Sequence, residues 1–398
     1  MIKRTALCLA VLCSFGCSPF AVAGPTAKFD SFIDDVQQEA AQNGIEHKYL
    51  RALDKLKPNA EVQRLAARQP EYVKPIWSYL VHMVTEERLR LGQRELARHD
   101  GFFDGLEEKY GVPRTILVAI WGVETNYGGN KGSFDVLQAL ATLGYDGKRA
   151  DFGRQQLLAA LEILQSGNIG LQDFKGSWAG AMGHTQFIPT TYLGYSADGT
   201  GDGIKNIWTE PKDALASAAY YLKRMGWRRG LLWGFEVYVP DNMDFSLAQL
   251  KKPRPAKFWR DKGVRGVSQN VDDALGDMSL FAPAGLRGPV FLVTKNFRTL
   301  LRYNTAPAYA LAVSHLSERF GGAAPFSVAW PMTDRPITPR EIEDMQRALL
   351  RAGYDTGDVD GVLGRQTIAA VRAFQKDRGL VADGYATPGL LTLLNAGR

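Results

Sequence analysis

The chain contains 398 residues and carries a formal net charge of +6. Basic and acidic residues are interspersed, which favours attraction to a polyanionic surface and argues against a dedicated nucleic-acid interface. The length predicts two or three domains, and no stretch after the N-terminus reaches the roughly 20 apolar residues that a membrane span needs.

The first 23 residues have the pattern of a secretory signal peptide. Two basic residues precede an apolar stretch at 6–15, and residues 21–23 form the small-x-small pattern of a signal peptidase site. All three cysteines fall in this segment, so the chain left after cleavage has no disulfide. We expect export to the periplasm. A lipoprotein cleavage site before Cys17 is the alternative, although Ser14 stands where such signals prefer leucine.

Residues 28–110 have apolar side chains at helical spacing between charged ones, which predicts one helical N-terminal layer. Within it, residues 75–79 form an aromatic cluster that could line a groove. A buried aromatic stripe is the more common explanation, and we favour it.

In residues 111–130 an apolar run carries a single carboxylate, Glu124, before a glycine turn. Pro113 suits the first turn of a helix and the glycines at 128–129 suit its end, although a buried strand over 116–123 fits the same apolar run. In the last turn of a helix, unpaired carbonyls would raise the pKa of Glu124, and burial would act in the same direction. Such a protonated carboxyl group is what a glycosidase acid requires, whereas a capped or salt-bridged surface glutamate is the alternative.

The pattern then predicts two more helices that end by residue 165. Residues 177–189 are rich in glycine and small side chains, which let backbone approach a ligand closely. Ser177 and Gln186 can donate and accept hydrogen bonds, as sugar hydroxyl and acetamido groups require. An ordinary tight loop is the alternative, and we expect His184 to be structural or solvent-facing.

Two motifs together resemble a known family. Gly-Val-Glu-Thr-x-Tyr-Gly surrounds Glu124, and Ser-Trp-Ala-Gly-Ala-Met-Gly-x-x-Gln-Phe-x-Pro begins at Ser177. In this order they are similar to the B-type bacterial lytic murein transglycosylases, and the similarity extends over about 29–320. The resemblance implies a lysozyme-like fold, makes Glu124 the catalytic acid and base, and places Ser177 and Gln186 in the sugar-binding groove.

Residues 198–203, Asp-Gly-Thr-Gly-Asp-Gly, place oxygens at every second position before a glycine, as an EF-hand loop does. Thr209 stands where that loop has its closing glutamate, so an Asp/Gly-rich turn without metal is the alternative. The resemblance implies a structural calcium loop, and no cofactor is expected for the chemistry. The implied ligands are Asp198, Thr200, Asp202, the carbonyl group of Ile204, and Asp213.

Beyond residue 234, β-rich segments at 235–239, 278–281 and 289–294 predict a small inserted sheet. A helix is expected to resume over 300–309. The resemblance adds four candidate substrate contacts: Tyr221, Tyr303, Asn304 and Tyr309. For the last three, the alternative is packing at a helix start, with Asn304 as a cap.

Residues 331–339 form a proline-rich linker, which predicts a second domain. The pattern of residues 340–396 predicts three helices joined by two Asp-Gly turns. These residues resemble the peptidoglycan-binding module of cell-wall enzymes. The positions that carry this resemblance are Gln346, Leu349, Gly353, Gly364, Thr367, Val371, Phe374 and Gln375. Three nearby aspartates could suggest a metal, but the Asp-Gly turns explain them more simply.

The expected architecture is therefore mainly α. A lysozyme-like α+β catalytic region at 24–330 is followed by the three-helix module. Its core is expected at about 111–233 and 297–320, with the inserted β-sheet subdomain at about 234–296.

The resemblance implies an exported enzyme that cleaves the β-1,4 bond between N-acetylmuramic acid and N-acetylglucosamine and forms a 1,6-anhydro sugar. Most glycosidases use two carboxylates, but these motifs contain one, so the substrate's N-acetyl group would stabilise the developing cation. Two alternatives are a hydrolytic muramidase, in which Asp135 or Asp151 positions water, and a non-catalytic peptidoglycan-binding scaffold. The expected partners are peptidoglycan glycan strands and other cell-wall enzymes, without nucleic acid.

Overall fold

The computed structural model describes residues 25–67 and 75–396, so the expected signal peptide at 1–23, with Cys17, lies outside the described residues. The helices are α1 (Pro25–Gln42), α2 (His47–Leu50), α3 (Ala60–Ala67), α4 (Ile76–Met83), α5 (Glu86–Arg98), α6 (Asp100–Tyr110), α7 (Arg114–Thr125), α8 (Val136–Gly144), α9 (Ala150–Gln165), α10 (Pro189–Tyr195), α11 (Pro211–Arg224), α12 (Ala256–Asp261), α13 (Lys295–Tyr303), α14 (Pro307–Phe320), α15 (Pro339–Arg351), α16 (Arg365–Asp377) and α17 (Pro388–Ala396). The strands are β1 (Phe134–Asp135), β2 (Lys175–Gly176), β3 (Gly234–Tyr238), β4 (Arg265–Gly266), β5 (Ser279–Phe281), β6 (Pro283–Leu286) and β7 (Val290–Val293). Within the described ranges, no helix is long and apolar enough to cross a membrane.

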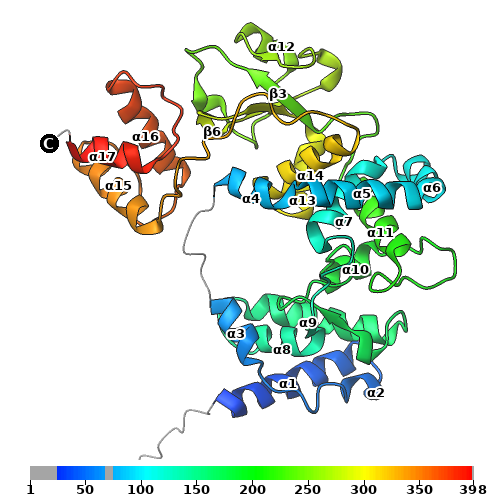
Figure 1. Ribbon diagram of the computed structural model, residues 1–398. Coiled ribbons are helices and arrows are strands. Elements are labelled where there is room, and N and C mark those ends of the chain that lie inside the picture. The colour runs from blue at the N-terminus through cyan, green and yellow to red at the C-terminus, as the bar shows by residue number, and fades with distance from the viewer. Residues whose placement is uncertain (1–24, 68–74, 397–398) are drawn as a thin grey trace, which may run out of the picture.

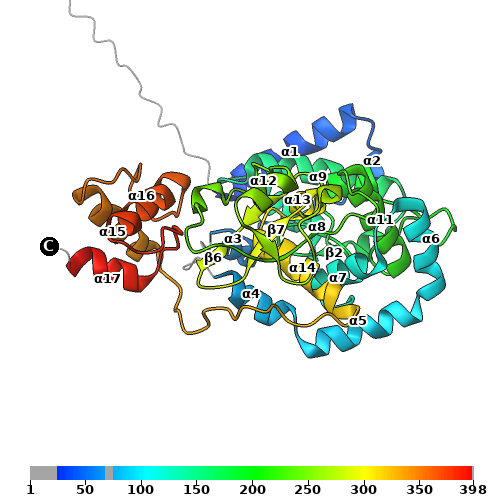
Figure 2. The ribbon, with the colours of Figure 1, turned by 90° about the horizontal axis from the view of Figure 1, so that it is seen from above.

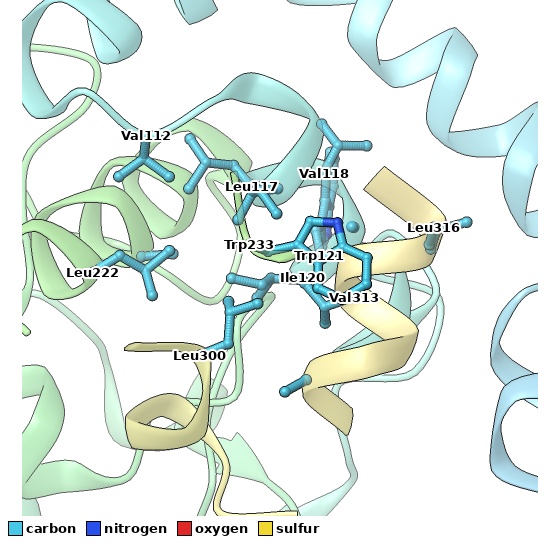
Figure 3. Packing of buried hydrophobic residues seen from close by; sticks show 14 of the residues in the cluster. Val112, Leu117, Val118, Ile120, Trp121, Leu222, Trp233, Leu300, Val313 and Leu316 are labelled. Atoms are coloured by element: carbon cyan, nitrogen blue, oxygen red, sulfur yellow. The ribbon is translucent and has the colours of Figure 1, made fainter. Parts of the chain in front are cut away.

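Helix α7 lies in the centre of the largest hydrophobic core. Its side chains from Ile116 to Trp121 are all buried, because α14 packs on one side and α5, α6 and α11 pack on others. Figure 3 shows Ile120 and Trp121 of α7 near Val313 and Leu316 of α14. A helix that is apolar on every side belongs in a core, which explains why the run lacks helical periodicity.

A second core lies on the other side of the molecule, where α1 and α2 pack against α8 and α9 (Figure 1). The prediction of one N-terminal helical layer is therefore wrong. Helices α1 to α3 belong to the α8–α9 side, whereas α4, α5 and α6 pack with α7, α11 and α14. Helical periodicity marks the apolar face of each helix, but it does not say which partner covers that face.

The inserted sheet is present as predicted, with antiparallel strands in the order β4-β3-β7-β5. Phe235 of β3 lies opposite Leu292 of β7, and both side chains face a separate small core around Trp259. The buried Glu236 carboxylate of β3 accepts the backbone N–H groups of Ser327 and Val328, at 2.7 and 2.9 Å. These bonds fasten the chain that leaves α14 to the sheet.

Helices α15, α16 and α17 form the C-terminal module around its own apolar core. Buried Gln346 accepts the N–H groups of Asp360 and Gly361 and donates to the Thr367 hydroxyl, so one side chain organises the first Asp-Gly turn. A capping box at Thr338 begins α15.

The module is not held apart by the linker. It lies beside β6 and the start of α4 (Figures 1 and 2). There the Asp383 carboxylate accepts the N–H of Leu286 at 3.2 Å, and the rings of Trp77 and Tyr385 lie 6.2 Å apart. Linker residue Ile337 is itself buried. The linker thus connects two parts that pack against each other.

Candidate active site

Glu124 lies in the last turn of α7, as the sequence predicts. The helix ends before the glycine pair, because Asn126 and Tyr127 already have φ of 50° and 60°, and Gly128 follows at 86°. Left-handed backbone at non-glycine residues is strained, and such residues are concentrated at functional sites. The Thr125 hydroxyl secures this end by donating to the carbonyl of His184 at 2.8 Å.

Burial raises the pKa of Glu124 from its ordinary value of 4.5 to about 7. Interaction with the Tyr309 hydroxyl acts in the opposite direction. A carboxyl group with this pKa exists in both protonation states near neutral pH, which is the property that an acid and base in one reaction needs.

Three tyrosines surround Glu124: Tyr79 of α4, Tyr303 of α13 and Tyr309 of α14. Burial raises the pKa of each hydroxyl, that of Tyr79 to about 12, and the negative charge of Glu124 raises all three further. The Tyr309 hydroxyl is buried and has no partner at hydrogen-bonding geometry within the described residues. Its donor therefore stays available to the carboxylate or to a substrate.

Tyr79 is a residue that the sequence analysis did not assign to the site, although the groove alternative for the 75–79 cluster includes it. The aromatic cluster at 75–79 was expected to be core, and Trp77 is indeed 4% exposed. Tyr79 stands two positions later, on a different side of α4, and its hydroxyl is influenced by the charge of Glu124. Only the packing of α4 beside α14 reveals this, because the two helices are far apart in sequence.

Tyr221 of α11 joins the same group of rings. Its ring lies edge-on to Tyr303 at 5.4 Å, and Tyr303 stacks on Tyr309 at 6.2 Å. The Tyr303 hydroxyl donates to the carbonyl of Thr185 at 2.6 Å, which ties α13 to the 177–189 loop. Tyr221 and Tyr303 pack against both large hydrophobic cores, so the site lies where these cores meet.

The predicted helix over 300–309 is two helices. Helix α13 ends at Tyr303 and α14 begins at Pro307, because a proline disfavours helical backbone in the residue before it and suits the first helical turn. Exposed Asn304 lies in the turn, and its side chain accepts the N–H of Ala306 at 3.0 Å. Asn304 thus forms a turn between the two helices and is not the N-cap of α14, which is Ala306, and Tyr303 and Tyr309 come from separate helices.

The 177–189 loop uses the two predicted polar side chains partly for its own structure. The Ser177 hydroxyl accepts the N–H groups of Ala179 and Ala181, and its O–H group can also donate. The Gln186 amide donates to the carbonyls of Lys131 and Gly183, at 3.2 and 2.9 Å, which leaves its oxygen as an acceptor. This loop lies beside residues 130–132, just after α7.

His184 is structural, as expected. Burial lowers its pKa to about 4, so the ring is neutral, and its Nδ1 accepts the indole N–H of Trp121 at 2.9 Å. This bond joins the 177–189 loop to α7, the helix that carries Glu124.

Comparison with known families agrees with this geometry. Residues 28–318 match the family described as Transglycosylase SLT domain, and residues 338–394 match the peptidoglycan binding domain family. The chain belongs to the SLT transglycosylases. Among curated proteins, membrane-bound lytic murein transglycosylase B of Escherichia coli (strain K12) is 29% identical over 277 residues, 68% of this chain and 73% of that protein. The chain is therefore a lytic murein transglycosylase, and the scaffold without catalytic activity is set aside.

Solved structures extend the similarity to both modules. SltB3 from Pseudomonas aeruginosa, in complex with NAG-anhNAM-pentapeptide, is 44% identical to this chain in sequence. The two structures match with a TM-score of 0.88, and the match covers 94% of this chain and 100% of that chain. Escherichia coli lytic transglycosylase Slt35, in complex with calcium, is 27% identical, with a TM-score of 0.64 over 75% of this chain and 93% of that one. The predicted fold class, mainly α with small sheets and a helical C-terminal module, is confirmed.

The two aspartates considered for a hydrolytic reaction have other surroundings in this transglycosylase. Asp135 caps α8 by accepting the N–H of Gln138, and it pairs with Lys175 at 3.4 Å. Asp151 is exposed in the first turn of α9. Neither aspartate, nor any other carboxylate of the described residues, contributes to the pKa shift of Glu124.

The predicted calcium loop forms a compact turn. The Asp198 carboxylate accepts the N–H groups of Thr200, Gly201 and Gly203, and buried Asp213 also accepts the N–H of Thr200. Asp202 instead accepts the N–H of Ile204. In residues 25–67 and 75–396 no three His, Cys, Asp or Glu side chains are grouped closely enough to hold a metal ion by themselves. A cation in this loop would therefore need hydroxyl and carbonyl oxygens as well.

Proposed function

We propose that this transglycosylase cleaves the β-1,4 bond between N-acetylmuramic acid and N-acetylglucosamine in peptidoglycan and leaves a 1,6-anhydro-N-acetylmuramic acid end. The observation that carries the proposal is the carboxyl group of Glu124, which lies in the last turn of α7 among Tyr79, Tyr303 and Tyr309. Burial raises its pKa to about 7, and no carboxylate of the described residues is among the causes of that shift. In glycosidases that use two carboxylates, the second carboxylate acts as the nucleophile or the base.

In the first step, protonated Glu124 donates its proton to the glycosidic oxygen while the bond from that oxygen to C1 of the muramic acid breaks. The N-acetyl oxygen of the same sugar stabilises the positive charge that develops at C1. Glu124 is then a carboxylate, and the Tyr309 hydroxyl, which lowers its pKa, stabilises that charge.

In the second step, the Glu124 carboxylate removes the proton of the C6 hydroxyl, and O6 bonds to C1. This closes the anhydro ring, restores protonated Glu124 and consumes no water. One group thus performs both proton transfers, and a pKa near the working pH serves each of them. Ser177, Gln186, Tyr221, Tyr303 and Asn304 are the proposed sugar contacts beside it.

The test is Glu124→Gln, which keeps the side-chain volume but cannot transfer the proton. Turnover of purified sacculi should fall by about 10⁴-fold while binding to sacculi persists. Asp135→Asn and Asp151→Asn are the matched controls and should lose far less. If Glu124→Gln released muropeptides near the wild-type rate, or if either control matched its loss, the assignment of Glu124 would fail.

We further propose export to the periplasm, supported by the signal-peptide pattern at 1–23, with lipidation at Cys17 as the alternative. The mass of the mature N-terminus distinguishes the two.

We also propose a structural calcium ion in the 198–203 loop, supported by the calcium complex of Slt35 and by the carboxylates of Asp198 and Asp213, which both accept the N–H of Thr200. Burial raises the pKa of Asp213, and the negative charge of Asp198 raises it further. A cation between them would therefore stabilise both carboxylates. Calcium should raise the melting temperature of EDTA-treated protein, since a ligand bound only to the native state stabilises it. If calcium left the melting curve of the EDTA-treated protein unchanged, residues 198–203 would be an Asp/Gly-rich turn that binds no metal.

A further inference from the structure

Basic side chains are concentrated on the surface where α6 and α11 end. These two helices pack side by side, on the side of the catalytic region away from the C-terminal module (Figures 1 and 2). The cations come from the end of α6, the end of α11, the loop that follows α11, and the first residue of α13, and all of them are exposed. They form a basic patch that consists of Lys109, Lys223, Arg224, Arg228, Arg229 and Lys295.

Three of these cations lie at the C-terminal end of α6. The Lys223 ammonium group donates to the carbonyl of Lys109 at 2.8 Å, and the two ammonium groups lie 5.9 and 5.2 Å from the centre of the Tyr110 ring. The Arg229 guanidinium donates to the carbonyl of Glu107 at 2.6 Å. Carbonyl groups at the end of a helix attract cations, which explains why these three lie here. Their positive charges remain on the surface, because a carbonyl group has no net charge.

Asn296 joins the loop after α11 to the start of α13. Its side chain accepts the N–H of Arg228 at 2.8 Å and donates to the carbonyl of the same residue at 2.9 Å, while Lys295 precedes it in the chain. At the end of the loop, the Thr294 hydroxyl donates to the carbonyl of Leu232, whose side chain is 43% exposed. The backbone of this loop is therefore fixed, and an apolar side chain next to the cations faces solvent.

Nearby acids do not neutralise the basic patch. Asp100, Asp104 and Glu107 of α6 pair with Arg114 at the start of α7. Glu108 is exposed, but within residues 25–67 and 75–396 neither it nor another carboxylate forms an ion pair with a cation of the patch. This surface therefore has a positive potential that favours an anionic partner.

The exposed leucine distinguishes between kinds of anionic partner. A soluble polyanion binds through charge alone, whereas a lipid bilayer has anionic head groups above an apolar layer. Surfaces that bind at the membrane interface combine basic residues with exposed apolar side chains. Leu232 follows Arg228 and Arg229 in the same short loop, so this surface has both features.

We propose that the basic patch and Leu232 form a docking surface for a membrane that contains anionic phospholipids. The cations contact the lipid phosphates, and the Leu232 side chain enters the head-group layer. Because the C-terminal module lies on the other side of the molecule, it can face peptidoglycan while the patch contacts the membrane (Figures 1 and 2).

The test is sedimentation with lipid vesicles of protein that lacks residues 1–23, so that neither this segment nor a lipid on Cys17 contributes. Wild type should bind vesicles of phosphatidylcholine mixed with anionic phosphatidylglycerol, but not phosphatidylcholine alone, and added salt should release it. The triple variant Arg224→Gln/Arg228→Gln/Lys295→Gln should bind about 100-fold more weakly, since each cation near an anionic surface contributes about fivefold. Leu232→Ser should bind about fivefold more weakly.

Lys251→Gln/Lys252→Gln/Arg265→Gln is the matched control. It removes three exposed cations of the inserted sheet subdomain, gives the same net charge as the first triple variant, and should keep wild-type binding. All variants should digest soluble muropeptides at the wild-type rate, because the patch lies outside the group of residues around Glu124. If melting curves show that the patch variant does not fold, Arg224→Gln/Arg228→Gln decides instead.

Four results would overturn the proposal. Equal binding of wild type to both kinds of vesicle, or to neither, would exclude recognition of anionic lipid. Equal losses in the two triple variants would show that only the net charge matters. Undiminished binding by Leu232→Ser, with equal affinity of wild type for soluble polyglutamate, would assign the patch to an acidic polymer. Slower digestion of soluble muropeptides by the patch variant would assign these cations to glycan binding.

Discussion

Glu124→Gln should stabilise the enzyme at alkaline pH, although its turnover should fall by about 10⁴-fold. Burial raises the pKa of Glu124 from 4.5 to about 7, so the folded protein binds this proton more tightly than the unfolded chain does. The folded state therefore loses stability as the pH rises from about 4.5 to about 7, and the full cost remains above that range. A shift of this size corresponds to roughly 3 kcal/mol at alkaline pH, and a neutral glutamine escapes it.

The assay is denaturant unfolding of wild type and Glu124→Gln at about pH 4 and about pH 8.5. The two proteins should have similar free energies of unfolding at the acidic pH, and the variant should be more stable by roughly 3 kcal/mol at the alkaline one. Glu87→Gln, on the exposed side of α5, is the control and should change either value by less than about 0.5 kcal/mol. A difference between Glu124→Gln and wild type that does not depend on pH would refute the reasoning, as would a variant less stable at alkaline pH.

Three further predictions concern the pH profile, a tyrosine and the docked module. The rate of wild-type turnover should fall about tenfold per pH unit above about pH 7, because Glu124 loses its proton. A steady-state rate that stays constant on this alkaline limb of the pH profile would contradict the prediction. Tyr309→Phe should move that limb to higher pH, since the hydroxyl lowers the pKa of Glu124, and a shift to lower pH would oppose the assignment. Gly285→Ala should loosen the module and speed proteolysis of the 331–339 linker, because a Cβ at this position would lie 2.1 Å from the Asp383 carboxylate. An unchanged digestion rate would show that the docking tolerates a Cβ.

Local patterns were sufficient for several parts of this fold. The apolar run after Pro113 placed Glu124 in the last turn of a buried helix, and the β-rich segments beyond residue 234 became the inserted sheet. The Asp-Gly turns marked the three-helix module, because the buried Gln346 and the turn at Gly361 are local features of one small core. Each of these predictions depended on residues that are close in sequence.

Long-range packing could not be predicted in the same way. Tyr79 reaches the site only because α4 packs on α14. The N-terminal helices divide between two cores, and no local pattern in the sequence indicates which core each helix joins. The docking of the C-terminal module depends on a contact between Gly285 and Asp383, which lie in different parts of the chain. A pattern within one segment shows which face of a helix or strand is apolar and must be buried, but not which distant segment covers that face.

The most direct test of the single-carboxylate mechanism is digestion of sacculi in water enriched in the heavy oxygen isotope, with the products weighed. If Glu124 transfers both protons and O6 closes the ring, the released muropeptides will carry anhydro ends without the label. Labelled, hydrated muramic acid ends from the wild-type enzyme would contradict the account and favour a hydrolytic muramidase.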